Sequence, residues 1–323
     1  MIAFALDRAR QTAIVAVFVT TLAFLLIHLA PGNPFSASPD DPRELAVARA
    51  ELRARYGLDR PLYVQYPVMV ANLARGRFGT SYMQARPVSE VVSATIPRTI
   101  VLMAPALLIG ILAGAILGTW QGTRADRLGD RVASAATLGT LSFPEFLIAL
   151  IVSTVFAVRL QWFPATGMTD AAVNAASFAS FAADVAWHAV LPVATLALVI
   201  ACVVSRYQRA AVVSAMDEEF VRAVRAKGVP QRRLILHHVL RRTGGSLFTV
   251  VGLLLPTLVG GAALVEFVFN WPGAGYTLLR AVTARDYPLV VALVLIGSIA
   301  VSIGSALADI GAALANPATR LEA

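Results

Sequence analysis

Residues Thr99–Trp120 read TIVLMAPALLIGILAGAILGTW and decide the fold class of this chain. The stretch is 22 residues long and contains no charged side chain. A helix that crosses the hydrocarbon core of a bilayer needs about 20 predominantly apolar residues, so the stretch predicts a transmembrane helix. Pro105 lies within it, and membrane helices tolerate proline where neighbouring helices satisfy the freed backbone groups. We therefore expect this helix to pack against others.

Five further stretches of similar character predict transmembrane helices. They are Thr12–Ala30, Val132–Val158, Ala186–Ser205, Ser246–Val268 and Leu289–Ala308. Of the 323 residues, 58% are apolar and 14% are charged, whereas soluble domains contain about 25% charged residues. The chain is therefore expected to be an all-α membrane protein with six transmembrane helices. The composition excludes a soluble enzyme and a disordered chain, and the single cysteine, Cys202, excludes a disulfide scaffold.

Small residues follow one face of the stretch that opened this section. Gly110, Gly114 and Gly118 recur at every fourth position, which places them on the same side of a helix. Such a face lets two membrane helices approach closely, and we interpret it as a packing surface in preference to a ligand site.

The distribution of basic residues predicts the orientation of the chain. With the N-terminus inside, the inner segments carry 15 Lys and Arg residues, and the two short outer loops carry 3. The first span is longer than a signal-peptide core, so we expect it to be retained. Both termini are predicted to be cytoplasmic. The net charge of +8 then reflects topology and contact with an acidic leaflet, and not a nucleic-acid partner.

The chain divides into four predicted regions. These are residues 1–30 (cytoplasmic N-terminus and first span), 31–98 (an extracytoplasmic segment), 99–310 (the transmembrane core, with a cytoplasmic loop at 206–242) and 311–323 (a cytoplasmic tail). In the outer segment, Glu44–Tyr56 has helical character, and Gly57–Pro61 is typical of a helix end. Leu62–Leu73 is a second apolar stretch. We expect a small helical cap on the outer face.

The loop between the fourth and fifth spans contains two predicted helices. Asp217–Glu219 opens the first, and Gly228 followed by Pro230 ends it. Arg232–Arg242 forms the second. Phe220 and Val224 give the first helix an apolar edge. From these residues alone, docking to a protein partner and lying on the lipid surface are equally favoured.

The residues Arg222–Gly228, followed ten positions later by His238, resemble the "EAA" loop of ABC-importer permeases. More narrowly, they are similar to the A-R-A-K-G form of the dipeptide/oligopeptide/nickel permease family. Further similarities occur in order along the chain, at Pro31–Pro34, Gly57–Pro61, Gly76–Ser81, Pro87-Val88, Trp162–Gly167, Leu191-Pro192, Ser205–Tyr207, Gly260-Gly261, Trp271–Gly273 and Asp286–Pro288. The chain departs from the family pattern at Arg242, Ser246 and Asn316.

The resemblance implies a pore-forming subunit of a type I ABC importer in the bacterial inner membrane. Its implied partners are a second permease chain in a heterodimer, two cytoplasmic ATPases that bind ATP and Mg, and an external solute-binding protein. This chain itself is expected to bind no cofactor and no metal. The residues implied to couple it to the ATPases are Glu219, Phe220, Arg222, Ala223, Val224, Arg225, Ala226, Lys227, Gly228 and His238. The implied cargo is di- and oligopeptides, with nickel chelates and glutathione as alternatives.

The sequence excludes this subunit as the ATPase. A phosphate-binding P-loop needs Gly-Lys followed by Ser or Thr. The only lysine, Lys227, is preceded by Ala226 and followed by Gly228.

Four residues are candidates for the substrate pathway or its gate: Glu145, Glu266, Trp271 and Asp286. Acids in a span are costly and need a pore, a partner or an interface, which applies to Glu145 and to Asp309. Glu145 could also bond to a neighbouring helix, and Glu266 could cap the turn at Gly273–Gly275. Asp130 is interpreted as a solvated loop residue.

Two other functions fit the sequence less well. A zinc protease would need H-E-x-x-H, and none of His28, His188, His237 and His238 forms it. A channel or secondary transporter would show inverted repeats, and the first and last three spans show no such similarity.

Overall fold

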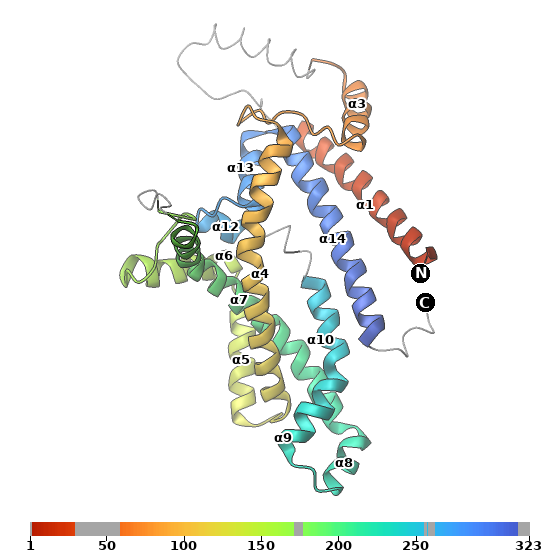
Figure 1. Ribbon diagram of the computed structural model, residues 1–323, viewed down its shortest axis with the longest axis vertical. Coiled ribbons are helices and arrows are strands. Elements are labelled where there is room, and N and C mark those ends of the chain that lie inside the picture. The colour runs from red at the N-terminus through yellow and green to blue at the C-terminus, as the bar shows by residue number, and fades with distance from the viewer. Residues whose placement is uncertain (1, 30–58, 171–176, 255–256, 258–261, 316–323) are drawn as a thin grey trace. The chain divides into compact units, whose positions relative to one another are not determined.

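The structure, a computed structural model, describes residues 2–29, 59–170, 177–254, 257 and 262–315 (Figure 1). The described chain forms two compact units. The first comprises Met1–Ile96 and Thr277–Ile299, and the second comprises Pro97–Tyr276 and Ala300–Ala323. Apart from one isolated bridge between Thr80 and Pro87, the regular structure of these residues is helical. This agrees with the all-α prediction.

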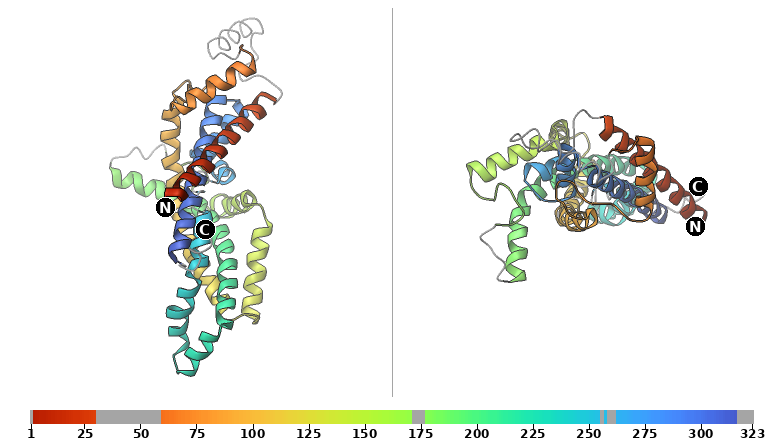
Figure 2. Two further views of the ribbon diagram at one scale, coloured as in Figure 1. Left: turned by 90° about the vertical axis from the view of Figure 1, so that its right-hand side faces the viewer. Right: turned by 90° about the horizontal axis from the view of Figure 1, so that it is seen from above.

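The second unit is built on a long helix, α7 (Phe178–Asp217), which packs against α5 (Leu128–Ser142) and α10 (Leu240–Leu254). Figure 2 shows α7 between these two helices. The unit also contains most of α4 (Val88–Gly122), α6 (Glu145–Val152), the π-helix η1 (Ser153–Arg159), α12 (Ala263–Val268) and the short helices between α7 and α10. Apolar side chains from these elements form one buried core that includes Leu102, Ile200 and Trp271.

The predicted glycine face of α4 packs directly on α7. A Cβ atom added at Gly110 would lie 2.7 Å from the Cβ of Ile200, and one at Gly114 would lie 2.7 Å from the Cβ of Val204. The face continues one turn further to Gly122, whose added Cβ would lie 2.7 Å from Val212. Since carbon atoms cannot approach this closely, only glycine allows the observed helix separation. The interpretation as a packing surface is confirmed.

Three of the described helices are long and apolar enough to cross a membrane: α4, α7 and the Tyr287–Ala306 part of α14 (Tyr287–Ala315). The predicted third span is not one straight helix, because Leu128–Ser142 and Glu145–Arg159 meet at a bend of 100°. Pro144 precedes α6 and has no backbone N–H to continue the helix. In the first predicted span, Arg10–Leu26 forms a shorter apolar helical stretch. The number of six spans therefore stays a prediction.

The first unit contains α1 (Ile2–Leu29), α3 (Leu62–Ala74) and parts of α13 (Ala274–Ala284) and α14. Helix α3 agrees with the helical segment expected at Leu62–Leu73. It is attached to α1 through Tyr66, whose hydroxyl lies 2.5 Å from Thr21 Oγ1 and whose ring packs edge-on against Phe24. Gln65 Oε1 lies 3.3 Å from His28 Nε2.

Several of the predicted features lie outside the described residues. They are Pro31–Pro34, the helix at Glu44–Tyr56, Gly57, Gly260-Gly261 and Asn316. The same applies to the side chain of Asp309.

Candidate docking site

The predicted cytoplasmic loop contains a short helix, α8 (Glu219–Ala226), directly after α7. Glu218 separates them, because its extended backbone (φ −67°, ψ 149°) turns the chain out of the helical path. After α8 come α9 (Gln231–Arg233) and the π-helix η2 (Leu234–Val239), which continue into α10. Figure 1 shows α8 and α9 beyond the ends of α7 and α10, where they close one end of this unit. Helix α8 thus ends before Gly228 as predicted and begins at Glu219, the last of the three predicted acids, whereas Asp217 still belongs to α7.

Helix α8 is held by one fully buried residue, Val221. Its side chain lies in a small apolar cluster with Val212 and Ala215 of α7 and with Leu234 and Val239 of η2. Phe220 and Val224 are half-buried against the same cluster. The apolar edge predicted at Phe220 and Val224 is therefore present, and the chain itself covers much of it.

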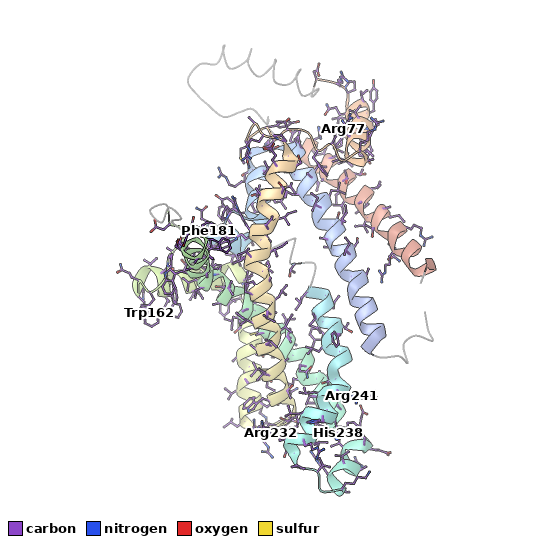
Figure 3. The ribbon with its side chains drawn as sticks, in the orientation of Figure 1. Arg77, Trp162, Phe181, Arg232, His238 and Arg241 are labelled. Carbon is purple, nitrogen blue, oxygen red and sulfur yellow. The ribbon has the colours of Figure 1, made fainter. Side chains whose placement is uncertain are left out.

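The other face of α8 is exposed and basic. Most of the predicted coupling residues lie on it with exposed side chains: Glu219, Arg222, Ala223, Arg225, Ala226 and Lys227. His238 lies on η2 and is also exposed (Figure 3). The residues that the sequence put in one group therefore divide into a buried edge that fixes α8 and an exposed face that a partner can reach.

Gly228 makes the turn after α8 possible. Its φ of +74° is in the left-handed region, where a side chain is unfavourable, and its N–H donates to the carbonyl of Arg225 at 2.9 Å. An added Cβ atom would meet no heavy atom within 4 Å. Glycine is therefore required for its backbone conformation and not for lack of space. The predicted turn is confirmed.

Arg242, one of the departures from the family pattern, has a partner within this loop. Its Nε lies 3.2 Å from Oε1 and 3.3 Å from Oε2 of Glu218. The pair connects the start of α10 to the residue that precedes α8, and thus bridges the two ends of the loop.

The helices behind the loop are joined by buried polar contacts. Arg209 of α7 donates to both carboxylate oxygens of Asp130 on α5, at 2.7 and 2.6 Å. Asp130 also accepts from the backbone N–H of Asp126 and from the hydroxyl of Ser134. With a side chain 1% exposed, Asp130 is not a solvated loop residue. That interpretation was wrong because the cation that neutralises it comes from a helix 79 residues away.

Gln208, the neighbour of Arg209, adds a second link. Its amide donates to Thr119 Oγ1 of α4 at 3.2 Å and to Thr243 Oγ1 of α10 at 3.1 Å. Residues 208 and 209 of α7 thus contact three other helices close to the loop. Such contacts resist independent movement of these helices.

Two of the proposed pathway residues form a second polar site in the same unit. Glu266 is fully buried and accepts from Thr99 Oγ1 at 2.8 Å and from the N–H of Tyr276 at 2.8 Å. Trp271, also fully buried, donates through its indole N–H to the carbonyl of Arg98 at 2.9 Å. These bonds hold the turn between α12 and α13 against the start of the α4 span, which is the capping role that the sequence left open for Glu266.

Asp286 has a similar role in the first unit. It is fully buried and accepts hydrogen bonds from Ser81 Oγ and from the N–H of Met83. It therefore anchors the loop before α4 to the start of α14.

Glu145, by contrast, begins α6 at the bend and is half-exposed. Within the described parts of the chain, its side chain has neither a hydrogen bond nor an ion pair. The role of these four residues in a substrate pathway or its gate stays a prediction.

Together, the fold and the site define an all-helical membrane subunit that presents a short, basic, exposed helix on a rigidly connected bundle. The sequence profile of binding-protein-dependent transport system inner membrane components matches residues 106–321. The chain belongs to this family, the permease subunits of ABC importers of the peptide, nickel and glutathione type.

Relatives extend the similarity over the whole length. The chain is 35% identical to the glutathione transport system permease protein GsiC of Salmonella typhimurium over 327 residues, which cover 99% of each protein. It is 34% identical to the GsiC protein of Escherichia coli K12 over 309 residues, or 94% of each. The family places the chain in the inner membrane as a multi-pass protein that works with ATPase and binding-protein partners.

Proposed function

We propose that this chain imports di- and oligopeptides as one of two permease chains in a heterodimer. Two cytoplasmic ATPases bind ATP and Mg and supply the energy, and an extracytoplasmic binding protein delivers the cargo. Both termini then lie in the cytoplasm. Family membership supports this assembly in outline, and the exposed helix α8 supports the mode of coupling.

The observation that carries the proposal is the division of α8 into two faces. Val221 fixes one face to α7 and η2, so α8 moves with the bundle. The other face exposes Ala223 and Ala226 between Arg222, Arg225 and Lys227. The small residues let the wall of a groove on the partner approach the helix closely. The flanking cations complement acidic residues at the rim of that groove. Together they form the pattern of helix-in-groove docking. Closure of the ATPases then pushes α8, and the linked helices rock as a body.

Lipid contact at the same helix is the competing interpretation. An interfacial helix would bury an apolar face of leucine or aromatic residues in the bilayer. In α8 the apolar side chains Phe220, Val221 and Val224 face the protein's own cluster, and the outward residues are arginine, lysine, alanine and one glutamate. This arrangement favours a protein partner.

Glutathione import is a second candidate, and one observation favours it: the relatives described above carry glutathione in their names. Glutathione is a tripeptide with a γ-linked first bond and a thiol, so it falls within a short-peptide class. Nickel-chelate import is a third possibility within the same family.

Uptake measured in cells that lack this chain discriminates these cargoes. Radiolabelled dipeptide, tetrapeptide, glutathione and nickel chelate would be supplied to the deletion strain and to the complemented strain. The proposal expects restored uptake of the α-linked peptides, whereas restoration of glutathione alone would favour the second candidate. Restored uptake that persists without the partner ATPases would overturn the importer mechanism.

Within the pathway, we propose different roles for the four acidic and aromatic candidates. Glu145 stands at a helix bend, is half-exposed and has no partner in the described chain, which supports a position facing the cargo. Glu266, Trp271 and Asp286 are enclosed, and each holds a loop. This supports an indirect role for them, in which they fix the loops that gate the pathway.

A further inference from the structure

A cavity of about 680 Å³ opens in the second unit between the C-terminal part of α4 and the segment formed by α9 and η2. Ligand pockets have volumes of about 300–1,000 Å³, so the cavity can hold a group of headgroup size. Neither the family match nor the coupling mechanism assigns a role to it.

One wall of the cavity is apolar. Ala115 and Ile116 contribute it from α4, and Ile235, Leu236 and Leu240 from the opposite segment. The side chains of Ile116 and Leu236 are 71% and 49% exposed, so the wall is open to its surroundings. An open apolar wall of this kind suits hydrocarbon chains better than it suits water.

The other end of the cavity is strongly basic. Arg124 and Arg127 follow α4, and Arg232 comes from α9 (Figure 3). None of the lining residues is acidic. Asp126 lies between Arg124 and Arg127 in the sequence but does not line the cavity. In the described residues these three guanidinium groups form no ion pair. Arg124 lies 5.1 Å from the centre of the Trp120 ring, which keeps it at the rim.

The change from apolar to basic coincides with the predicted membrane boundary. Trp120 is the last residue of the predicted second span, and tryptophan is enriched at the level of lipid headgroups. On the proposed topology, the apolar wall faces the acyl chains of the inner leaflet and the arginines face its headgroups. Basic pockets between membrane helices on the cytoplasmic side are suited to anionic lipid headgroups.

We infer that this cavity binds one anionic phospholipid of the inner leaflet. Arg124, Arg127 and Arg232 hold its phosphate, and its acyl chains lie along Ile116 and Leu236. The lipid joins α4 to the helical segment that carries α8, so it stiffens the base of the docking helix. The occupant is a lipid and not a free phosphate, because the apolar wall is continuous with the basic end.

Native mass spectrometry of the complete transporter in neutral detergent tests this inference, with phosphatidylglycerol and chain-matched phosphatidylcholine as probes. The pocket variant is Arg124→Gln/Arg127→Gln/Arg232→Gln. The control is Arg206→Gln/Arg233→Gln/Arg241→Gln, which removes the same charge from exposed positions outside the cavity. Ala115→Trp fills the apolar wall while it keeps every arginine, and serves if the pocket variant fails to fold.

We expect the wild type and the control to retain phosphatidylglycerol in preference to phosphatidylcholine. The pocket variant should lose about tenfold or more in affinity, because each basic residue near an anionic headgroup contributes several-fold. Ala115→Trp should also lose the lipid. Equal loss in the control, equal retention of both lipids, or retention by Ala115→Trp would overturn the inference.

Two further outcomes would also overturn it. Displacement of phosphatidylglycerol by millimolar inorganic phosphate would identify a site for soluble anions. Lipid binding by the isolated chain that disappears in the complete transporter would show that the second permease chain occupies the cavity. Both outcomes leave the importer proposal untouched, since peptide uptake is measured separately.

Discussion

Gly228 shows how one residue can set the geometry of the docking site. Its positive φ directs the chain from α8 into α9, and the space around its Cα is open. Arg209 and Asp130 act at the same scale: their paired side chains hold α7 to α5 near the loop. Neither effect depends on the type of cargo, since both act on the geometry of the helices around the loop.

Gly228→Val is expected to lower ATP-driven uptake at least several-fold, whereas Gly228→Asn should stay near wild type. The left-handed conformation costs a non-glycine residue about 1–2 kcal/mol and is unfavourable above all for β-branched side chains, whereas asparagine visits it readily. Uptake into proteoliposomes at matched protein content measures the difference. Equal transport by the two variants would show that the turn does not contribute to coupling.

Asp130→Asn should destabilise the chain by roughly 1–3 kcal/mol, because it leaves the half-buried Arg209 without its counter-ion. The matched control is Glu90→Gln, which breaks the Arg86–Glu90 pair. Both partners there are more than half exposed, so the expected loss is below about 1 kcal/mol. Thermal unfolding of the purified protein measures both. A larger loss in the control would contradict the role assigned to Asp130.

At the scale of elements, two helix surfaces determine how the unit assembles. The glycine face of α4 sets its distance from α7, and the apolar edge of α8 sets the position of the docking face. The glycine face meets its complement on a helix far away in the chain, whereas the edge of α8 packs against α7 and η2, its neighbours in the sequence. A substitution on either surface should therefore change the stability of the unit through its packing and not through its helix propensity.

Gly114→Val is expected to force α4 and α7 apart and to destabilise the bundle by about 1–3 kcal/mol, as overpacking of a close contact does. Gly139→Val introduces the same side chain into α5, where an added Cβ atom meets nothing within 4 Å. The control should be close to wild type. Comparison of the two unfolding temperatures in one detergent gives the result, and equal shifts would contradict close packing at Gly114.

Ala223→Trp is expected to reduce co-purification of the ATPases about tenfold or more. The new ring would stand on the exposed face of α8 and obstruct a groove, while Val221 and its cluster stay intact. Ala210→Trp places the same ring at an exposed position of α7, outside α8. Unchanged recovery with Ala223→Trp, or equal loss with the control, would favour the lipid-facing interpretation.

At the scale of the whole molecule, orientation in the membrane decides which surfaces meet which partners. On the proposed topology, the basic loop faces the ATPases and the segment before α4 faces the binding protein. The short loops support this orientation, because their arginines favour the cytoplasm. Residues 31–98 carry nine arginines and are placed outside because segments longer than about 60 residues largely escape this rule.

A phosphatase reporter fused after Gly76 should lie on the extracytoplasmic side of the membrane and be active. One fused after Gly228 should lie in the cytoplasm and be inactive. Each position is exposed in the structure, so fusion leaves the packed helices intact. A reporter active only in the cytoplasm serves as the complementary measurement at the same two sites. Opposite signals would overturn the topology and, with it, the direction of transport.

The sequence by itself determined the features that depend on neighbours along the chain. The apolar runs, the glycine face of α4, and the bounds of α8 with its turn at Gly228 are all readable from spacing and residue type. The permease family was also evident from ordered motifs. These features are local because helix formation and turn conformation depend on residues within a few positions.

Only the tertiary structure decided which side chains meet over long distances. It paired Asp130 with Arg209, buried Val221 and much of Phe220, and enclosed Glu266 and Asp286 behind loops. It also placed Arg232 and Arg124 in the lining of one cavity. No local pattern encodes these contacts, because they depend on how helices separated by tens of residues pack. A buried charge is stable there only when packing supplies its partner.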